Sequence, residues 1–105
     1  MKVFGLIGFP LSHSFSKKYF SEKFIRENIP DCRYELFPLK DISAFTDLWK
    51  NNPDLMGVNV TIPYKEKVIP FLDSSSDVVI KTGACNCIKK MNGVLPYLFQ
   101  ELPII

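Results

Sequence analysis

Apolar residues form four strand-like stretches along the chain, and helix-like stretches lie between them. Near-continuous or alternating apolar runs predict strands at residues 2–8, 33–39, 55–61 and 84–90. Residues 14–29 are predicted to form a helix, because apolar side chains recur there at a spacing of four. The first strand is apolar along almost its whole length, which is typical of a strand covered on both faces.

Three shorter helices complete the pattern. They are predicted at 42–51 after an Asp41 N-cap, at 63–72 with Pro63 in its first turn, and at 75–82 before a stop at Gly83. Strands and helices therefore alternate in the order β-α-β-α-β-α-α-β. This order predicts a single α/β domain whose mainly parallel sheet carries helices on both faces, a three-layer α/β/α arrangement.

The end of the chain does not follow this alternation. Residues 91–93, Met-Asn-Gly, favour a hairpin-like turn. Residues 94–105 form an apolar tail with two prolines and no period, so we assign no element to them. Because the tail holds one charge, Glu101, we expect it or an edge strand to support a homodimer.

Polar side chains gather where the predicted strands end. In open α/β sheets, ligands bind outside the carboxyl ends of the strands. Three segments place hydrogen-bonding groups at that edge, after the first strand, around the end of the third, and in the fourth. The candidate ligand-binding residues are Ser14, Ser16, Asn59, Thr61, Lys65 and Asn86.

Each candidate also has an ordinary interpretation. Ser14 alone is more simply an N-cap, although a helix N-terminus also suits a carboxylate. Lys65 is expected in a first helical turn, where the helix dipole disfavours a cation, and that setting suits a proton donor and acceptor. An exposed lysine beside Glu66 is the equally weighted alternative. His13 is more typical of a structural hydrogen-bonding group.

Composition excludes several classes of function. The 105 residues suit one domain, and 47% hydrophobic with 23% charged residues argues against disorder. A net charge of +2 without a basic stripe argues against nucleic acid, and no apolar run reaches membrane length. No G-x-G-x-x-G or P-loop is present, so the chain has no nucleotide-phosphate cradle of its own.

Three cysteines, Cys32, Cys85 and Cys87, are an odd number for a disulfide framework. Together with the lack of a signal peptide, they favour a reducing compartment, and we expect a cytoplasmic protein. Cys85 and Cys87 resemble a metal pair, but the chain offers one histidine and zinc needs about four ligands. We therefore interpret them as small residues that fill the core and expect no metal.

Three segments of the sequence resemble a known family. "GLIGFPLSHSFS", "GVNVTIPYKEKV" and "GACNCI" are similar to the G-x-P-x-x-H-S-x-S, N-V-T-x-P-x-K and G-A-x-N-T segments of shikimate dehydrogenases. They occur in the same order, with similar spacing, and span residues 5–88. The resemblance assigns residues 1–93 to the substrate-binding domain of that family.

The resemblance implies roles for the candidate residues. Ser14 and Ser16 would bind a substrate carboxylate with Thr61 nearby, and Asn59, Lys65 and Asn86 would bind ring hydroxyls. Lys65 would be the catalytic acid and base. The family reduces 3-dehydroshikimate to shikimate with NADPH, in aromatic amino acid biosynthesis, so the implied ligand is shikimate or 3-dehydroshikimate.

The sequence departs from the family in three places. Cys87 replaces the usual threonine, and no aspartate follows Asp77 to partner Lys65. We do not assign that role to Glu101, because the tail around it does not match. The NADP-binding Rossmann domain is not in this sequence, so we expect no cofactor binding and no activity from these residues alone. They correspond to a truncated, frame-shifted or partial shikimate dehydrogenase, or alternatively to a non-catalytic module that binds shikimate-like or quinate-like acids.

Overall fold

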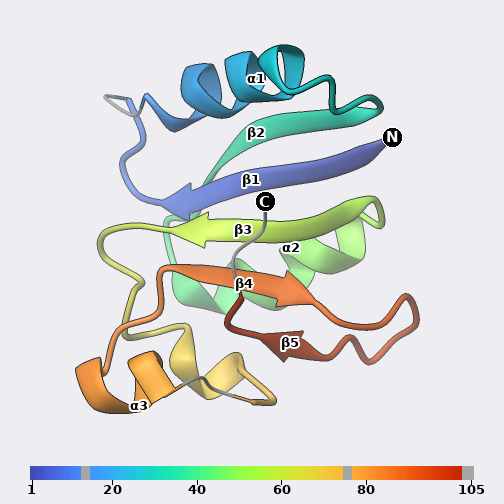
Figure 1. The fold of residues 1–105 in the computed structure, drawn as a ribbon. Coiled ribbons are helices and arrows are strands. Elements are labelled where there is room, and N and C mark those ends of the chain that lie inside the picture. Colours follow the sequence, from blue (N-terminus) through green and yellow to red (C-terminus); the bar gives the residue numbers. More distant parts are fainter. Residues whose placement is uncertain (13–14, 75–76, 103–105) are drawn as a thin grey trace.

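Five strands form one mixed sheet in the order β2-β1-β3-β4-β5 (Figure 1). The computed structural model describes residues 1–12, 15–74 and 77–102. Strands β1, β2 and β3 are mutually parallel, and β4 runs antiparallel to both β3 and β5. The strands are β1 (Lys2–Gly8), β2 (Cys32–Pro38), β3 (Leu55–Val60), β4 (Cys87–Lys90) and β5 (Phe99–Gln100). The predicted α/β class and mainly parallel sheet are confirmed.

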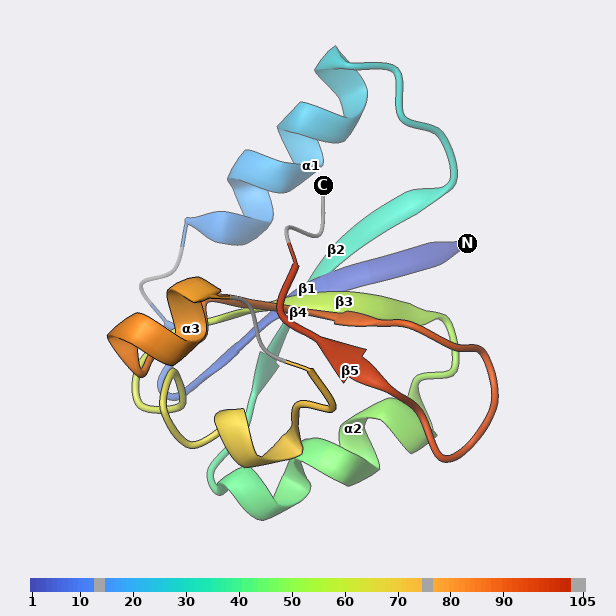
Figure 2. The same ribbon diagram turned by 60° about the horizontal axis from the view of Figure 1, so that its bottom comes forward.

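Helices cover both faces of this sheet (Figure 2). Helix α1 lies on one face, and the other helical segments lie on the opposite face, so the predicted three layers are present. The helical segments are α1 (Ser16–Arg26), η1 (Ile42–Ala44), α2 (Phe45–Asn51), η2 (Ile69–Phe71) and α3 (Asp77–Thr82). No described helix is long and apolar enough to cross a membrane.

The face under α1 holds the smaller part of the core. Phe4 and Leu6 of β1 pack there with Phe24 of α1 and Tyr34 of β2. The ring of Phe20 stacks on that of Tyr34, with centroids 4.6 Å apart. The first turns of α1 are therefore tied to the middle of β2 by aromatic packing.

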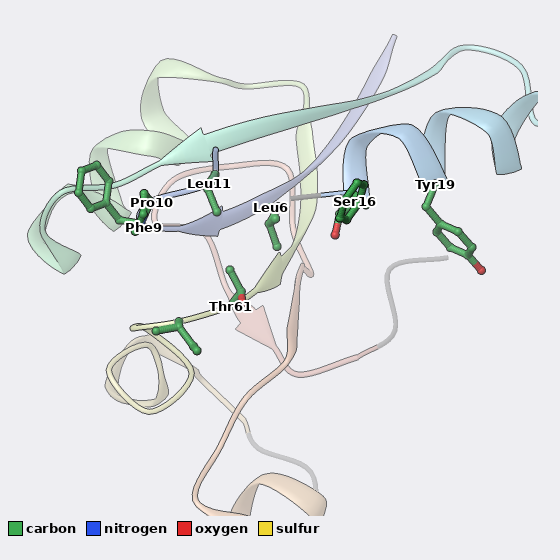
Figure 3. A pocket seen from close by; sticks show the side chains of 9 residues that line it. Leu6, Phe9, Pro10, Leu11, Ser16, Tyr19 and Thr61 are labelled. Atoms are coloured by element: carbon green, nitrogen blue, oxygen red, sulfur yellow. The ribbon is translucent and has the colours of Figure 1, made fainter. Parts of the chain in front are cut away.

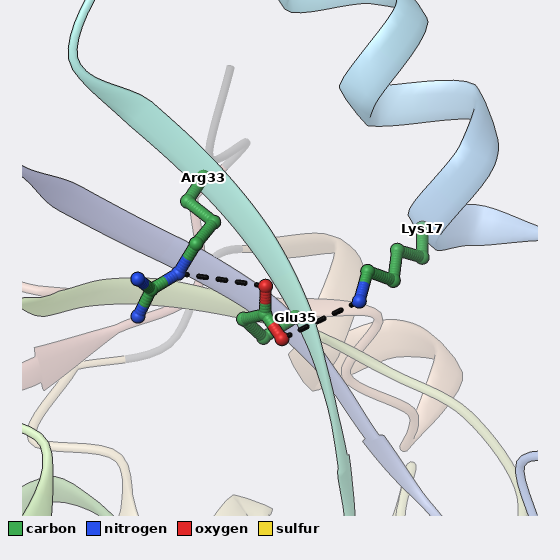
Figure 4. A network of polar contacts seen from close by, with 3 residues as sticks. All are labelled: Lys17, Arg33 and Glu35. Atoms are coloured by element: carbon green, nitrogen blue, oxygen red, sulfur yellow. Dashed lines mark hydrogen bonds and ion pairs between the residues drawn. The ribbon is translucent and has the colours of Figure 1, made fainter.

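An ion-pair network adds a second link between α1 and the edge strand β2 (Figure 4). The carboxylate of Glu35 lies 3.5 Å from Nζ of Lys17 and 3.4 Å from Nε of Arg33. All three side chains are solvent-accessible, so this network contributes little to stability. Its charges also discourage further strands from adding to β2.

The opposite face holds the larger core. Phe45 and Trp49 of α2 are fully buried there, beside Val58 of β3 and Ile88 of β4. Phe99 of β5 packs on them, with its ring centroid 4.7 Å from that of Trp49. Phe99 lies in the tail to which no element was assigned, and it completes both the sheet and the larger core.

The hairpin that brings the tail back uses residues 91–98 rather than a tight Met-Asn-Gly turn. The N–H of Met91 donates to the carbonyl of Leu98 at 2.8 Å, and the side chain of Asn92 accepts from Leu98 N at 2.6 Å. Asp73, from the loop after η2, accepts from the N–H of Phe99 at 2.7 Å. Polar contacts thus hold both sides of β5.

The predicted helix at 63–72 is wrong, because this stretch forms turns and the short η2 helix. Its backbone groups bond to different kinds of partner. The carbonyl of Lys65 accepts from the N–H of Cys85 at 2.7 Å, while Ile69 N donates only three residues back, to Glu66. The hydroxyl of Tyr64 donates to the carbonyl of Leu39. Separate local turns, together with the tertiary bond from Cys85 to Lys65, therefore take the place of a continuous helical ladder.

The other predicted elements are present with shifted ends. Helix α1 is shorter than predicted, because Asn28 adopts φ +52° and Ile29 N donates to the carbonyl of Phe24 at 2.9 Å, a closing motif of helix C-termini. Asp41 caps the next helical segment by accepting from Ser43 N at 2.8 Å. Gly83, with φ +69°, follows α3 as predicted.

Candidate functional site

An open cavity of about 760 Å³ lies at the carboxyl ends of β1 and β3 (Figure 3). Its walls come from the end of β1 and the loop after it, from the first turn of α1, and from the residues after β3. The lining residues are Leu6, Phe9, Pro10, Leu11, Phe15, Ser16, Tyr19, Thr61 and Ile62. Ser16 and Thr61, two of the predicted ligand-binding residues, thus contribute hydroxyls to one cavity.

The parallel pairing of β1 with β3 creates this arrangement. Ile7 lies opposite Val60, so the two chains leave the sheet side by side. Thr61 N donates to the carbonyl of Ile7 at 3.0 Å, and Phe9 N donates to the carbonyl of Ile62 at 3.1 Å. These two hydrogen bonds extend the pairing past the strand ends and fix Thr61 against the loop after β1.

Asn59 lies one row deeper in the sheet, beside Leu6 of the cavity wall. Its half-buried side chain donates a 2.9 Å hydrogen bond from Nδ2 to the hydroxyl of Tyr34. Burial raises the pKa of Tyr34, and its hydrogen bonds with Asn59 and Ser16 partly oppose that rise. Tyr34 carries no recognisable motif in the sequence, and its signal is a polar atom at an inward-facing position of β2.

Lys65 and Asn86 are joined to this region through their backbones. The carbonyl of Asn86 accepts from the N–H of Val60 at 2.7 Å, and that of Lys65 accepts from Cys85. Both side chains are exposed. Lys65 borders a separate shallow cavity of about 210 Å³, which shares Ile62 with the larger one. Asn86 precedes β4 rather than lying within a strand.

The predicted site residues therefore fall into two groups. Ser16, Asn59 and Thr61 surround the large cavity or lie behind its wall. Lys65 and Asn86 lie on the adjoining segments with side chains in solvent. Ser14, like His13, lies outside the described residues, so its predicted role stays a prediction. The N-cap position of α1 is occupied by Phe15, which makes no capping hydrogen bond with its side chain.

Cys85 and Cys87 lie at least partly buried around the start of β4. Burial raises the pKa of both Cys85 and Cys87 to about 11, and the carboxylate of Glu101 adds to the rise. The thiol of Cys87 donates to Oε1 of Glu101 across 3.7 Å. Among the described residues, no group of three or more metal-binding side chains occurs. These two thiols fill space between neighbouring side chains.

Gly5 and Gly8 of β1 lie very close to neighbouring groups. A Cβ on Gly5 would overlap the ring of Phe37, and one on Gly8 would overlap the Cγ2 methyl of Thr61. These glycines therefore allow close packing between strands and loops instead of a close approach to a pyrophosphate.

Comparison with known proteins agrees with the motifs. The family model described as the shikimate dehydrogenase substrate binding domain matches residues 6–88. An NADP(+) shikimate dehydrogenase of Geobacillus kaustophilus is 41% identical over 100 residues, which cover 90% of this chain and 34% of that protein. The chain spans about a third of the length of the curated relatives it matches.

Solved structures show the same domain. Shikimate dehydrogenase 1 from Peptoclostridium difficile has a TM-score of 0.82 and 30% identity, over 98% of this chain and 38% of that one. Shikimate 5-dehydrogenase from Listeria monocytogenes, in complex with shikimate and NAD, has a TM-score of 0.80 and 26% identity, over 96% and 34%. The chain therefore belongs to the shikimate dehydrogenase family and constitutes its N-terminal substrate-binding domain.

Proposed function

We propose that this chain binds shikimate or 3-dehydroshikimate in the cavity between β1, β3 and α1. The observation that carries the proposal is the presence of the Ser16 and Thr61 hydroxyls in one cavity, with Asn59 hydrogen-bonded behind its wall. The Listeria monocytogenes relative was solved with shikimate bound, which supports this ligand class. A ring acid needs an anion site and several neutral hydrogen-bonding groups, and we assign both to this edge of the sheet.

The carboxylate is assigned to the start of α1. A helix N-terminus presents unpaired backbone N–H groups and a partial positive charge, which favour an anion. The first turn of α1 contains no acidic residue, and Ser16 opens it beside Lys17 and Lys18. Ser16 donates to the carboxylate in this proposal, with Ser14 beside it and Thr61 on the facing wall.

The ring hydroxyls are assigned to Asn59, Asn86 and Lys65. The Lys65 side chain is exposed in a turn, and a lysine has rotatable donors on a flexible stem. It serves as the proton donor to the carbonyl oxygen of 3-dehydroshikimate and as the acceptor in the reverse direction. Asn59 and Asn86 orient the ring so that this oxygen faces the amine.

The relatives are named as NADP(+) enzymes, and in them a bound nicotinamide would supply the hydride. We assign to the residues of this chain only substrate binding and the proton. These residues alone should not oxidise shikimate with NADP. Turnover of the purified chain within the common enzyme range of about 1–1000 per second would contradict this expectation.

The binding proposal is tested by titrating shikimate into the ¹⁵N-labelled chain. We expect millimolar affinity, about −4 kcal/mol, because one domain supplies only one wall of the site. Amide signals of Ser16, Asn59, Thr61 and Asn86 should shift. Ser16→Ala and Lys65→Met should weaken binding, and Lys67→Met, two residues beyond Lys65, is the matched control. The absence of shifts at high ligand concentration would overturn the proposed site.

The proposal also covers the oligomeric state of the chain and its cellular compartment. Val94, Leu95 and Leu98 remain exposed on the hairpin before β5, so a weak homodimer through this hairpin is part of it. Light scattering on the parent chain and on a Leu95→Ser/Leu98→Ser variant tests the dimer. If both chains are monomeric, the dimer is contradicted.

We also propose that the chain is cytoplasmic. Three free cysteines suit the reducing cytoplasm, where the chain would encounter the substrate of the family.

A further inference from the structure

The hydroxyl of Tyr34 joins two of the residues assigned to the ligand. Tyr34 is 1% exposed and lies on β2, whereas Asn59 lies on β3, with β1 between them. Leu6 of β1 pairs with Asn59 on one side and with Leu36 on the other, so all of these residues face α1. The tyrosine side chain reaches across β1, and its hydroxyl accepts from Asn59 Nδ2 at 2.9 Å.

Ser16 is the second hydrogen-bonding partner of this hydroxyl. It belongs to α1, which packs over the same face of the sheet and also lines the cavity (Figure 3). Phe20, one turn further along α1, stacks on the Tyr34 ring at 4.6 Å with an interplanar angle of 16°. The ring therefore has little freedom to move its hydroxyl away from these partners.

We propose that Tyr34 is a positioning residue that fixes the orientation in which the Asn59 side chain meets the ligand. The inference rests on the proposed ring-acid site. The phenol oxygen accepts from Nδ2 of Asn59, so Nδ2 is held toward Tyr34. Asn59 therefore keeps Oδ1 as an acceptor for the ligand.

This orientation of Asn59 has a consequence for specificity. Asn59 presents an acceptor to the ligand, which suits a ligand hydroxyl rather than a ketone oxygen. Tyr34 on β2 thus sets the polarity with which Asn59 on β3 recognises the ring.

The test begins without ligand, so that it does not depend on shikimate binding. In Tyr34→Phe the Asn59 side-chain amide loses its acceptor, and its ¹⁵N–¹H signals should shift and exchange faster with water. The Asn59→Ala variant assigns these signals. Tyr97→Phe, on the opposite face of the sheet, is the matched control and should leave them unchanged. Unchanged Asn59 signals in Tyr34→Phe would overturn the inference.

The second arm measures binding by the same titration. Tyr34→Phe should weaken shikimate binding about fivefold, the usual effect of one hydrogen bond, and Tyr97→Phe should not. The preference for shikimate over 3-dehydroshikimate should also narrow in Tyr34→Phe, because Asn59 Oδ1 is then no longer fixed toward a ligand hydroxyl. In an Asn59→Ala background the effect of Tyr34→Phe should shrink, because the two residues act as a unit.

The outcomes separate this inference from the proposed function. If the parent chain does not bind shikimate but Asn59 loses its hydrogen bond in Tyr34→Phe, the proposed function fails and the hydrogen-bond network stands. If Tyr34→Phe weakens every ligand equally, in both backgrounds, its role is packing alone and the inference is overturned. A fivefold loss of shikimate affinity in Tyr34→Phe that disappears in the Asn59→Ala background supports the inference.

Discussion

Gly8 and Thr61 approach each other so closely that no side chain fits between them. A Cβ on Gly8 would overlap the Cγ2 methyl of Thr61 and would lie 3.0 Å from both the Ile62 carbonyl and Cδ2 of Leu11. All three of these neighbours, Thr61, Ile62 and Leu11, line the candidate cavity. Replacement of Gly8 would therefore move the cavity wall as well as the end of β1.

Gly8→Ala should lower the free energy of unfolding by about 2 kcal/mol, because backbone atoms and a fixed threonine cannot give way easily. It should also weaken shikimate binding by displacing Thr61. Urea unfolding and ligand titration measure the two effects. Gly93→Ala is the matched control, since no atom lies within 4 Å of its added Cβ, and it should change stability by less than about 0.5 kcal/mol.

Asp41 makes the stability of the η1–α2 segment depend on pH. The backbone N–H of Ser43, 2.8 Å away, holds the pKa of the Asp41 carboxyl below its ordinary value. A carboxyl with a lowered pKa in the folded state stabilises the fold above its unfolded pKa of about 3.9. That contribution is lost as the pH falls through the lower, folded pKa.

Asp41→Ala should therefore unfold more easily than the parent chain at pH 7, and the difference should disappear in strong acid. Asp41→Asn keeps an N-cap without a titrating group, so it should retain the cap at both ends of this range. Urea midpoints at several pH values provide the measurement. An equal difference between Asp41→Ala and the parent at pH 2 and pH 7 would show that the carboxylate charge is not involved.

Local patterns predicted the elements that local interactions build. The apolar runs of β1 and β3 and the cap at Asp41 depend on residues close in sequence, and all three appear in the structure. The helix expected at 63–72 failed for the opposite reason. The Lys65 carbonyl accepts from Cys85, a partner twenty positions away, and no local pattern reveals such a bond.

The same limit explains what was missed around the site. Tyr34 meets Asn59 only because β2 and β3 flank β1, which depends on the strand order. The strand β5 is two residues long, and contacts of Phe99 with α2 stabilise it rather than any period in the tail. The motifs identified Ser16, Asn59 and Thr61, but not the tyrosine that connects two of them.

The charged side chain of Lys90 is almost completely buried. It is 7% exposed, its ammonium donates to the Pro53 carbonyl at 2.9 Å, and it lies 4.5 Å from the ring centre of Tyr97. Burial lowers the pKa of Lys90, and the nearby Asp54 opposes that shift. Between the lowered folded pKa and the ordinary lysine pKa of about 10.4, the unfolded chain holds more protons than the folded one.

The parent chain should therefore gain stability relative to Lys90→Met as the pH rises through that interval. Methionine keeps most of the apolar stem and removes the titrating group, and the other basic groups are common to both chains. Urea unfolding of the two proteins at a series of alkaline pH values measures the difference. A difference that stays constant or falls with rising pH would contradict the assigned cause.

Phe99 anchors the hairpin after β4 to the larger core. Its ring lies 4.7 Å from that of Trp49 and 5.5 Å from that of Phe45, and both partners are fully buried. Phe99→Ala should lower the free energy of unfolding by about 3 kcal/mol, because it opens a cavity beside two rigid rings.

Leu98 provides the control for this prediction, since the neighbouring side chain is exposed and its replacement by alanine should cost less than about 0.5 kcal/mol. Trp49 is the only tryptophan, so its fluorescence reports directly on the packing that Phe99 completes. Urea unfolding followed at this residue should show an earlier midpoint for Phe99→Ala and a shifted native emission. Equal midpoints for the two variants would mean that β5 contributes nothing to the core, and the apolar hairpin would then be free to serve only self-association.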